Sequence, residues 1–284
     1  ADILIIAPLT ATTLSKWVTG NADGLIPSIL IANNKPIIVA PAMNTKMWRN
    51  QAVQKNYKIL ENYQNILLLK PSEGTLACDE IGVGKIAPND LIQLALSFIA
   101  LQNQKPFQRD LLNKDFLITG GCTSEKIDAA RNITNNSSGT MGLLLAQVAN
   151  FRGAKVKFIH GPLKIRKDIT EGINRDEIET SRDLHKAIRK EISNCDFFIM
   201  NAAVADFKIL SDTSKKISKS KLENSLKNIE LVPDILRDVS KTKKHNQIFV
   251  GFCAFTGSFK NARKTIKEKI MLKDCDVLFA NPID

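Results

Sequence analysis

The chain has 284 residues, of which 44% are hydrophobic and 24% are charged, and its formal net charge is +11. This length suits two ordinary domains, and the Lys and Arg residues are scattered without interleaved aromatic residues, so we expect anionic small-molecule substrates and no nucleic acid. No apolar run approaches the ~20 residues of a membrane span, and the chain opens on a strand rather than a signal peptide, which predicts a cytoplasmic protein without membrane contact.

The cysteine and histidine residues show no spacing typical of a metal site. The three histidines form no ligand pattern, and no C-x-x-C pair occurs. The five cysteines are far apart: Cys78, Cys122, Cys195, Cys253 and Cys275. The sequence therefore predicts neither a zinc site nor a disulfide framework.

The N-terminal part alternates strands with helices. Asp2 to Pro8 is an apolar run typical of a buried parallel strand, and the polar stretch from Leu9 to Thr13 follows it. Polar groups just past the carboxyl end of a strand lie where open α/β sheets bind ligands. Further expected elements are a helix near 14–18, strands at 36–40 and 66–70, a glycine-rich flap at 73–86 and a helix at 89–101.

A polar segment at 103–110 breaks the helical pattern and has the composition of a linker. We therefore expect a boundary near 105–113, a first domain at 1–104 and a second at 113–284. The regular strand–helix alternation of the second domain predicts a mostly parallel sheet in a Rossmann-like, doubly wound fold. Its expected strands are 115–119, 154–160, 196–200, 247–252 and 276–280, and its expected helices are 138–152, 182–194, 233–242 and 259–272.

The stretch from Ile118 to Gly142 has the features of a ligand loop. An apolar strand runs into Gly120 and Gly121, and roughly sixteen polar residues follow before the next helix, whereas connections in α/β units usually have about 2–6 residues. Backbone amides around the glycines and the helix N-terminus beyond them favour phosphate. The same pattern also fits an ordinary turn, because glycines after a strand are a weak signal by themselves.

Longer motifs carry a family resemblance. Residues 119–128 are Thr-Gly-Gly-Cys-Thr-Ser-Glu-Lys-Ile-Asp, and residues 131–142 are Arg-Asn-Ile-Thr-Asn-Asn-Ser-Ser-Gly-Thr-Met-Gly. Residues 202–206 are Ala-Ala-Val-Ala-Asp, 233–236 are Pro-Asp-Ile-Leu and 250–252 are Val-Gly-Phe. In this order the segments resemble the motifs of phosphopantothenoylcysteine synthetase, which in bacteria is commonly fused behind a flavin-dependent phosphopantothenoylcysteine decarboxylase.

The resemblance implies that the second domain joins 4′-phosphopantothenate to cysteine with CTP and Mg²⁺, through an acyl-cytidylate. It implies catalytic roles for Asn135 and Lys216, substrate binding by Arg131 and metal binding by Asp206. The nucleotide contacts that it implies are Gly121, Met200, Asn201, Ala202, Asp206, Lys216, Pro233, Asp234, Ile235, Phe252, Lys269 and Lys273. Lys269 and Lys273 are four residues apart and so lie on one face of a helix.

The first domain resembles the decarboxylase, a flavodoxin-like three-layer fold. Residues 41–48 contain Pro-Ala-Met-Asn and Met-Trp, and residues 76–78 are Leu-Ala-Cys with Gly82 and Gly84 behind them. The resemblance implies that Asn44 binds the substrate carboxylate, that Cys78 returns a proton to the enethiol from a mobile flap, and that Thr10 and Thr12 contact FMN. An ordinary helix N-cap at Asn44 and a small buried residue at Cys78 are the plainer interpretations.

Several positions depart from the family pattern. Cys122, Ser124, Ala130, Val232 and Phe255 differ from the usual synthetase residues. The first strand, phosphate loop and catalytic histidine of the decarboxylase family precede the segment that Asp2 matches, so we expect an incomplete decarboxylase half that does not act alone. The family also implies a homo-oligomer, with a synthetase dimer and a decarboxylase trimer.

Two other interpretations remain open. One is a non-catalytic relative that retained the fold and lost turnover, which the departures above favour. The other is a nicotinamide-dependent reductase on the same fold; against it, the third glycine of the dinucleotide motif and a Tyr-x-x-x-Lys pair are missing from the sequence.

Overall fold

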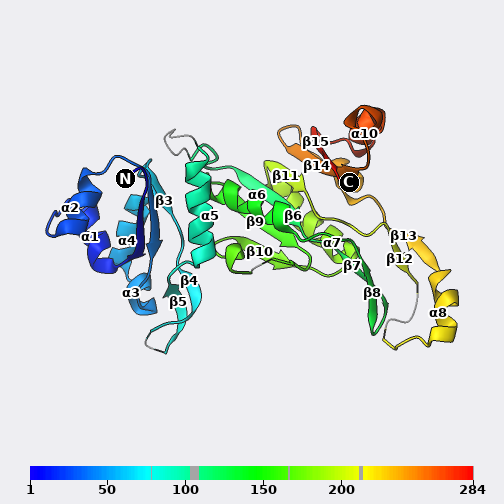
Figure 1. Ribbon diagram of the computed structural model, residues 1–284, viewed down its shortest axis with the longest axis horizontal. Coiled ribbons are helices and arrows are strands. Elements are labelled where there is room, and N and C mark those ends of the chain that lie inside the picture. Colours follow the sequence, from blue (N-terminus) through cyan, green and yellow to red (C-terminus); the bar gives the residue numbers. More distant parts are fainter. Residues whose placement is uncertain (78, 103–108, 166, 211–213, 284) are drawn as a thin grey trace. The chain divides into compact units, whose positions relative to one another are not determined.

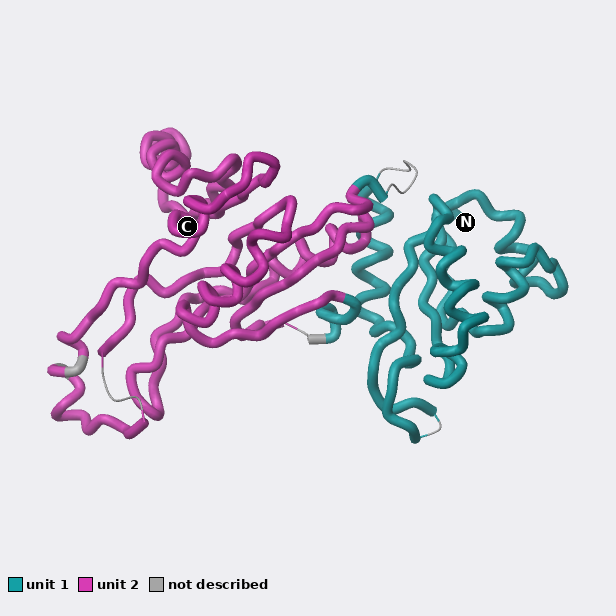
Figure 2. Tube along the Cα trace, turned by 180° about the vertical axis from the view of Figure 1, so that it is seen from behind, with its two compact units in different colours: residues 1–110, 167–172 teal, residues 111–166, 173–284 magenta. Residues whose placement is uncertain are grey.

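A computed structural model of the protein describes residues 1–77, 79–102, 109–165, 167–210 and 214–283. The chain forms two compact units, shown in Figure 2. Unit 1 takes residues 1–110 and 167–172, and unit 2 takes residues 111–166 and 173–284, each without the undescribed positions.

Unit 1 is built on a short parallel sheet. Its strands are β1 (Leu4–Leu9), β2 (Ile37–Pro41) and β3 (Ile66–Leu68), in the order β1-β2-β3. All five residues of β2 are buried, because this apolar run is the central strand. The helices are α1 (Ala11–Val18), α2 (Leu25–Ala32), α3 (Thr45–Arg49), α4 (Gln51–Leu60), α5 (Asn89–Ala100) and the 3-10 turn η1 (Lys167–Thr170).

The core of unit 1 joins the sheet to α1 and α4, which contact each other (Figure 1). Leu14 and Leu60 are fully buried, and Trp17 packs with them. The expected flap is an antiparallel hairpin of β4 (Ser72–Thr75) and β5 (Ile81–Lys85). Its glycines allow it to lie against the chain near Asn44, since a Cβ at Gly84 would be 2.0 Å from the Met43 carbonyl oxygen.

Unit 2 contains a six-stranded sheet in the order β10-β9-β6-β11-β14-β15, with every pair parallel. The strands are β6 (Asp115–Gly120), β9 (Lys155–His160), β10 (Asn174–Glu177), β11 (Phe197–Met200), β14 (Ile248–Phe255) and β15 (Val277–Pro282). The helices are α6 (Thr140–Phe151), α7 (Ser181–Glu191) with the 3-10 turn η2 (Ile192–Asn194), α9 (Ile235–Ser240) and α10 (Phe259–Lys273). The α/β fold expected from the sequence is confirmed.

Helices of unit 2 pack on the sheet. On one face, Leu117, Phe198 and Phe249 join residues of α7 and α9 in a single apolar cluster. Helix α6 contacts β6 and β9. The helix approaches the sheet closely because Gly142 lies against Gly120. A Cβ added at Gly142 would be 2.8 Å from the Cα of Gly120.

Several of the elements were not predicted from the sequence, among them α2, β10 and two antiparallel strand pairs. The expected polar loop after β6 contains an antiparallel hairpin, β7 (Ser124–Asp128) with β8 (Arg131–Thr134). The stretch between the expected strand 196–200 and the expected helix 233–242 contains β12 (Phe207–Ile209) and β13 (Ile229–Leu231), which pair with each other, and α8 (Lys219–Leu226). β7 and β8 are largely polar, and β12 and β13 have only three residues each, so none of the four gives the longer apolar alternation that predicts a strand. Tertiary contacts fix them instead.

Among the described residues, no helix combines the length and apolar character that crossing a bilayer requires.

We predict that Leu14→Ala destabilises unit 1 by about 2–5 kcal/mol, because it removes buried methyl groups and leaves a cavity beside Trp17. Urea unfolding followed by tryptophan fluorescence measures this, since both tryptophans, Trp17 and Trp48, lie in unit 1. Leu25→Ala is the matched control: Leu25 is 77% exposed, so this variant should differ from the parent by no more than about 0.5 kcal/mol. Equal losses in the two variants would contradict the assigned core.

Candidate functional site

The carboxyl ends of β6 and β11 bring two predicted ligand segments together. The strands pair in parallel, with Met200 opposite Thr119, so the segments that follow the two strands leave the sheet at the same edge. The buried hydroxyl of Thr119 accepts hydrogen bonds from the backbone N–H groups of Asn201 and Ala202, both at 3.1 Å. The same hydroxyl lies 3.4 Å from the sulfur of Met200. One side chain thus fixes the start of the second segment.

Further hydrogen bonds join the two segments beyond the strands. The N–H of Ala203 donates to the carbonyl of Gly121 at 2.9 Å, and the carbonyl of Ala203 accepts from Thr123 at 3.0 Å. The buried hydroxyl of Thr123 in turn accepts from the N–H of Ala205 at 2.9 Å. The glycine loop and the segment 201–206 therefore form one continuous backbone surface.

Asn135 reaches this surface from β8. Its side-chain Nδ2 donates to the carbonyl of Val204 at 2.9 Å, and the residue is half-buried. Gly121 has φ +73°, and a Cβ there would lie 2.9 Å from the carbonyl oxygen of Gly161. Only glycine suits that position without strain. Asn135 and Gly121, predicted from separate motifs, are thus both hydrogen-bonded to the segment 201–206.

Asp206 lies at the exposed end of this segment, and Lys216 precedes Ile217, which is bonded to the β7–β8 hairpin. The carbonyl of Asp206 accepts from the N–H of Val232 at 2.9 Å, which holds the end of the segment beside β13. The residues Asp206 and Lys216 are both exposed. Among the described residues, no group of three His, Cys, Asp or Glu side chains is placed to hold a metal ion.

Arg131 belongs to an ionic cluster on the hairpin. Its Nε donates to Asp128 Oδ2 at 3.0 Å, its Nη2 pairs with the same oxygen, and Nη2 also donates to the carbonyl of Ile217 at 2.7 Å. The N–H of Ile217 donates back to Asp128 Oδ2 at 3.1 Å. The hydrogen bonds from Arg131 hold the pKa of the fully buried Asp128 carboxyl well below its usual range.

The remaining predicted nucleotide residues lie around α9 and α10. Asp234 caps α9 by accepting from the N–H of Arg237 at 3.2 Å, and it forms an ion pair with Lys273 at 2.8 Å. Pro233 is exposed, Ile235 is buried, and Lys269, one turn before Lys273, is half-buried. Phe252 stacks on Phe279 with ring centroids 5.3 Å apart. Residues 233–235 lie at the start of α9, Phe252 lies within β14, and the two lysines lie on α10. Within the described part of the chain, the side-chain hydrogen bond of Asn135 goes to Val204 and not to these residues.

In unit 1, Asn44 is the N-cap of α3, as the plainer interpretation held. Its Oδ1 accepts from the N–H of Lys46 at 2.8 Å, while its Nδ2 donates to a carboxylate oxygen of Glu80 at 2.9 Å. Thr10 caps α1, with its hydroxyl 3.3 Å from the N–H of Thr13, and Thr12 is exposed in the first turn. Cys78 lies outside the described residues.

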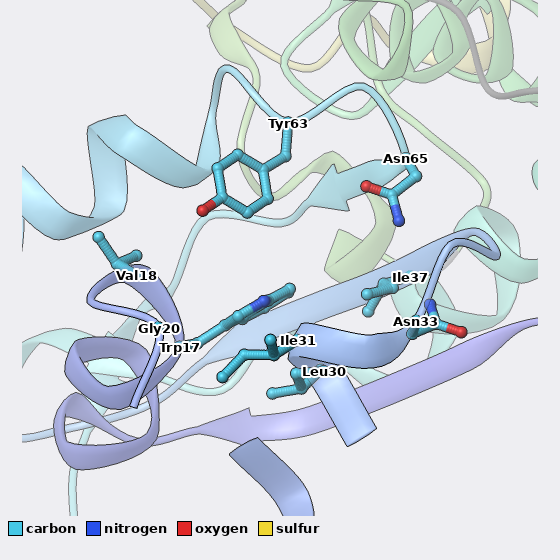
Figure 3. Close-up of a pocket in the computed structure, with 9 residues that line it drawn as sticks. All are labelled: Trp17, Val18, Gly20, Leu30, Ile31, Asn33, Ile37, Tyr63 and Asn65. Atoms are coloured by element: carbon cyan, nitrogen blue, oxygen red, sulfur yellow. The ribbon is translucent and has the colours of Figure 1, made fainter. Parts of the chain in front are cut away.

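An apolar hollow of about 250 Å³ lies elsewhere in unit 1. Figure 3 shows Trp17 and Tyr63 beside Leu30 and Ile31 around it. Ile37, the first residue of β2, also lines it, so the hollow is at the amino end of the sheet. Thr10 and Asn44 follow the carboxyl ends of their strands, and neither is among its lining residues.

Sequence reasoning missed three side chains that hold the site of unit 2 together. Thr119, Thr123 and Asp128 all stand inside the quoted motif, but no role was assigned to them. Their signal is polar character at positions that become fully buried, at 0%, 0% and 1% exposure. A buried hydroxyl or carboxylate requires partners. For all three side chains these partners include backbone N–H groups of segments far along the chain.

The chain matches two family models. Residues 111–284 match the model described as DNA/pantothenate metabolism flavoprotein C-terminal domain, and residues 1–99 match the model described as Flavoprotein.

Curated relatives match over the whole chain. A Vibrio cholerae protein named coenzyme A biosynthesis bifunctional protein CoaBC is 33% identical over 286 residues, covering 100% of this chain and 68% of the relative. The protein of the same name from Borreliella burgdorferi is 35% identical, covering 100% of this chain and 70% of the relative. The Escherichia coli K12 protein of that name is 32% identical, with 100% and 68% coverage.

Two solved structures resemble the chain, and one of them carries the same name as these relatives. The C-terminal domain of a coenzyme A biosynthesis bifunctional protein CoaBC has a TM-score of 0.50 and 31% identity, covering 60% of this chain and 78% of that chain. A DNA/pantothenate metabolism flavoprotein from Streptococcus pneumoniae has a TM-score of 0.50 and 19% identity, covering 60% and 82%, and supports the fold alone. By its family models and its relatives, the chain belongs to the family of coenzyme A biosynthesis bifunctional proteins.

Proposed function

We propose that unit 2 is a phosphopantothenate–cysteine ligase that uses CTP. The observation that carries this proposal is the surface formed by Gly121, Asn135 and residues 201–206. It combines backbone groups beside a glycine loop with an amide side chain and a carboxylate, Asp206, at its exposed end. Such a surface suits a nucleotide that lies along the backbone of residues 201–206 and whose phosphate charge a metal ion shares at the exposed carboxylate.

The reaction has two steps, because a carboxylate is a poor electrophile. In the first step a carboxylate oxygen of 4′-phosphopantothenate attacks the α-phosphorus of CTP, and the bond to the bridging oxygen breaks to release pyrophosphate. The product is an acyl-cytidylate. In the second step the neutral amine of cysteine attacks the acyl carbon, loses a proton and expels CMP, which leaves the amide. The protein's task is to orient the reacting groups and compensate their charge.

Asn135, Arg131 and Lys216 take the roles nearest the reacting atoms. Asn135 would hold the acyl-nucleotide, since its amide already lies on the backbone of the segment 201–206. Arg131 would bind an anionic group of phosphopantothenate. Lys216 is an exposed cation one residue before Ile217. It would offset the negative charge that develops on the phosphates during the reaction.

The nucleotide would contact Met200, Asn201 and Ala202 at the end of β11. Phe252 and residues 233–235 would contact it further along the sheet edge, and Lys269 and Lys273 would meet its triphosphate. Lys273 is paired with Asp234 at 2.8 Å, so it would exchange this carboxylate for a phosphate. Mg²⁺ held by Asp206 would neutralise phosphate charge in the bound complex.

We also propose that unit 1 is the decarboxylase-like half that contacts FMN and phosphopantothenoylcysteine. The Glu80 carboxylate on the Nδ2 of Asn44 stands in for the substrate carboxylate, and its distance of 2.9 Å is that of a normal hydrogen bond. The hydroxyls of Thr10 and Thr12 fit a flavin contact, because they lie where β1 ends and α1 begins. Bound FMN would supply oxidation of the substrate thiol, and Cys78 would return a proton.

The direct test is product release by the purified chain given CTP, magnesium, 4′-phosphopantothenate and cysteine. We expect CMP and pyrophosphate in equal amounts, dependent on phosphopantothenate, with a parallel ATP reaction deciding nucleotide choice. A folded protein that binds CTP but releases no CMP would support the interpretation as a relative without turnover.

Lys216→Gln should lower kcat for ligation by at least about 10-fold, because it removes the cation that compensates phosphate charge. The neighbouring variant Lys215→Gln is the matched control, since Lys215 is equally exposed and has no assigned role. Steady-state CMP release measures both. Ligation that survives Lys216→Gln unchanged would remove Lys216 from the mechanism.

Asn135→Ala should reduce ligation by about 10- to 100-fold, because it removes an amide that orients the acyl-nucleotide. Asn136→Ala should retain activity, since Asn136 is exposed and its Oδ1 accepts only a long bond of 3.3 Å from Lys164. Single-turnover formation of the acyl-cytidylate separates the two steps. Equal activities of the two variants would contradict the assignment of Asn135.

A further inference from the structure

The segment that carries Lys216 is fastened to the β7–β8 hairpin through both backbone polar groups of one residue, Ile217. Ile217 donates its N–H to Asp128 at 3.1 Å and accepts from Arg131 at 2.7 Å through its carbonyl. Asp128 and Arg131 are 86 or more residues away along the chain from Ile217. In Figure 1 the hairpin and the strands β12 and β13 both extend from the six-stranded sheet, and β7 contacts β12. We call the three residues Asp128, Arg131 and Ile217 the latch.

Asp128 is the centre of the latch. Its side chain is fully buried, and it accepts from the N–H of Ala130 at 2.8 Å as well as from Arg131 and Ile217. A buried carboxylate is stable only with such partners, and removing one side of the set leaves charged or polar groups unsatisfied. Since its pKa is held well below the usual range, chiefly by the hydrogen bonds from Arg131, the carboxyl stays ionised at neutral pH.

The latch also fixes the guanidinium of Arg131. Among the described residues, the hydrogen bonds of Arg131 run through Nε and Nη2, which leaves Nη1 for a ligand. The side chain is 33% exposed. A guanidinium donates in a rigid planar fork, so holding one edge on Asp128 sets the direction of the other edge.

We propose that Asp128 is a positioning residue that places both Arg131 and the Lys216 segment for the ligase reaction. This inference rests on the proposed function for its effect on catalysis, but not for the existence of the latch. Asp128 itself touches neither substrate nor nucleotide. It acts through the direction of Arg131 Nη1 and through the peptide adjoining Lys216.

The first measurement is hydrogen exchange of the wild-type protein, which needs no variant and no activity. The amide of Ile217 should exchange at least about 10-fold more slowly than those of its exposed neighbours Lys215 and Lys216, because it is bonded to a buried carboxylate. Exchange of Ile217 as fast as its neighbours would overturn the proposal.

The second measurement uses Asp128→Asn, which keeps the size of the side chain. An amide cannot accept on both edges, so Ala130 or the pair of Arg131 and Ile217 loses its acceptor. Trypsin cleavage after Lys215 or Lys216 should become about 10- to 100-fold faster, without new cleavage in the strands of the sheet. Asp238→Asn is the matched control. Asp238 lies on α9 and pairs with Arg189 of α7 at 2.6 Å, so its replacement should leave cleavage after Lys215 or Lys216 unchanged. Unchanged cleavage in Asp128→Asn would overturn the latch.

Kinetics of the same variants test the positioning role. In Asp128→Asn, kcat should fall and the KM for phosphopantothenate should rise, each by about 10-fold, while the KM for cysteine stays within about threefold. A purely structural loss would reduce the active fraction and leave both KM values unchanged, which would overturn the role. If the wild-type protein does not ligate, the proposed function fails, and exchange and cleavage still decide the latch.

Discussion

The parallel pairing of β6 with β11 is the constraint on which the site of unit 2 depends. It puts Thr119 opposite Met200, so two segments about eighty residues apart in sequence leave the sheet at one edge. The buried hydroxyls of Thr119 and Thr123 then bind backbone N–H groups that no strand partner satisfies. The same hydrogen bonds that satisfy these buried groups also shape the ligand surface.

Polar groups at the candidate sites are paired with one another in the protein itself. Lys273 is bound to Asp234, the amide of Asn44 to Glu80, and Arg131 to Asp128. Two of these pairs join exposed or half-buried groups, and an anionic ligand can replace the carboxylate at modest cost. The third differs because Asp128 is fully buried, so breaking it would strand a charge. In the first two pairs the carboxylate can therefore give way to a ligand, whereas the pair of Arg131 and Asp128 holds the arginine side chain in a fixed position.

Much of the fold could be predicted from residue pattern. Apolar runs such as 116–118 and 197–200 indicated buried strands, and their alternation with amphipathic stretches gave an α/β protein with a parallel sheet. The hairpin β7–β8 and the pair β12–β13 escaped prediction. A short, mostly polar strand such as Arg131–Thr134 has only a weak periodic signal, since its position depends on partners elsewhere in the chain.

The sequence by itself determined which residue types stand after each strand, because motif order and spacing are local properties. The resemblance of its motifs to those of the synthetase family indicated Asn135, Asp206 and Lys216 as candidates, and the glycine pair after the strand indicated a turn at Gly121. Only the tertiary structure decided which of these segments meet. It placed Asn135 on the carbonyl of Val204 and Ile217 between Asp128 and Arg131. These contacts span tens of residues, and burial gives Asp128 a role that its local sequence does not disclose, because the need for partners arises only once water is excluded.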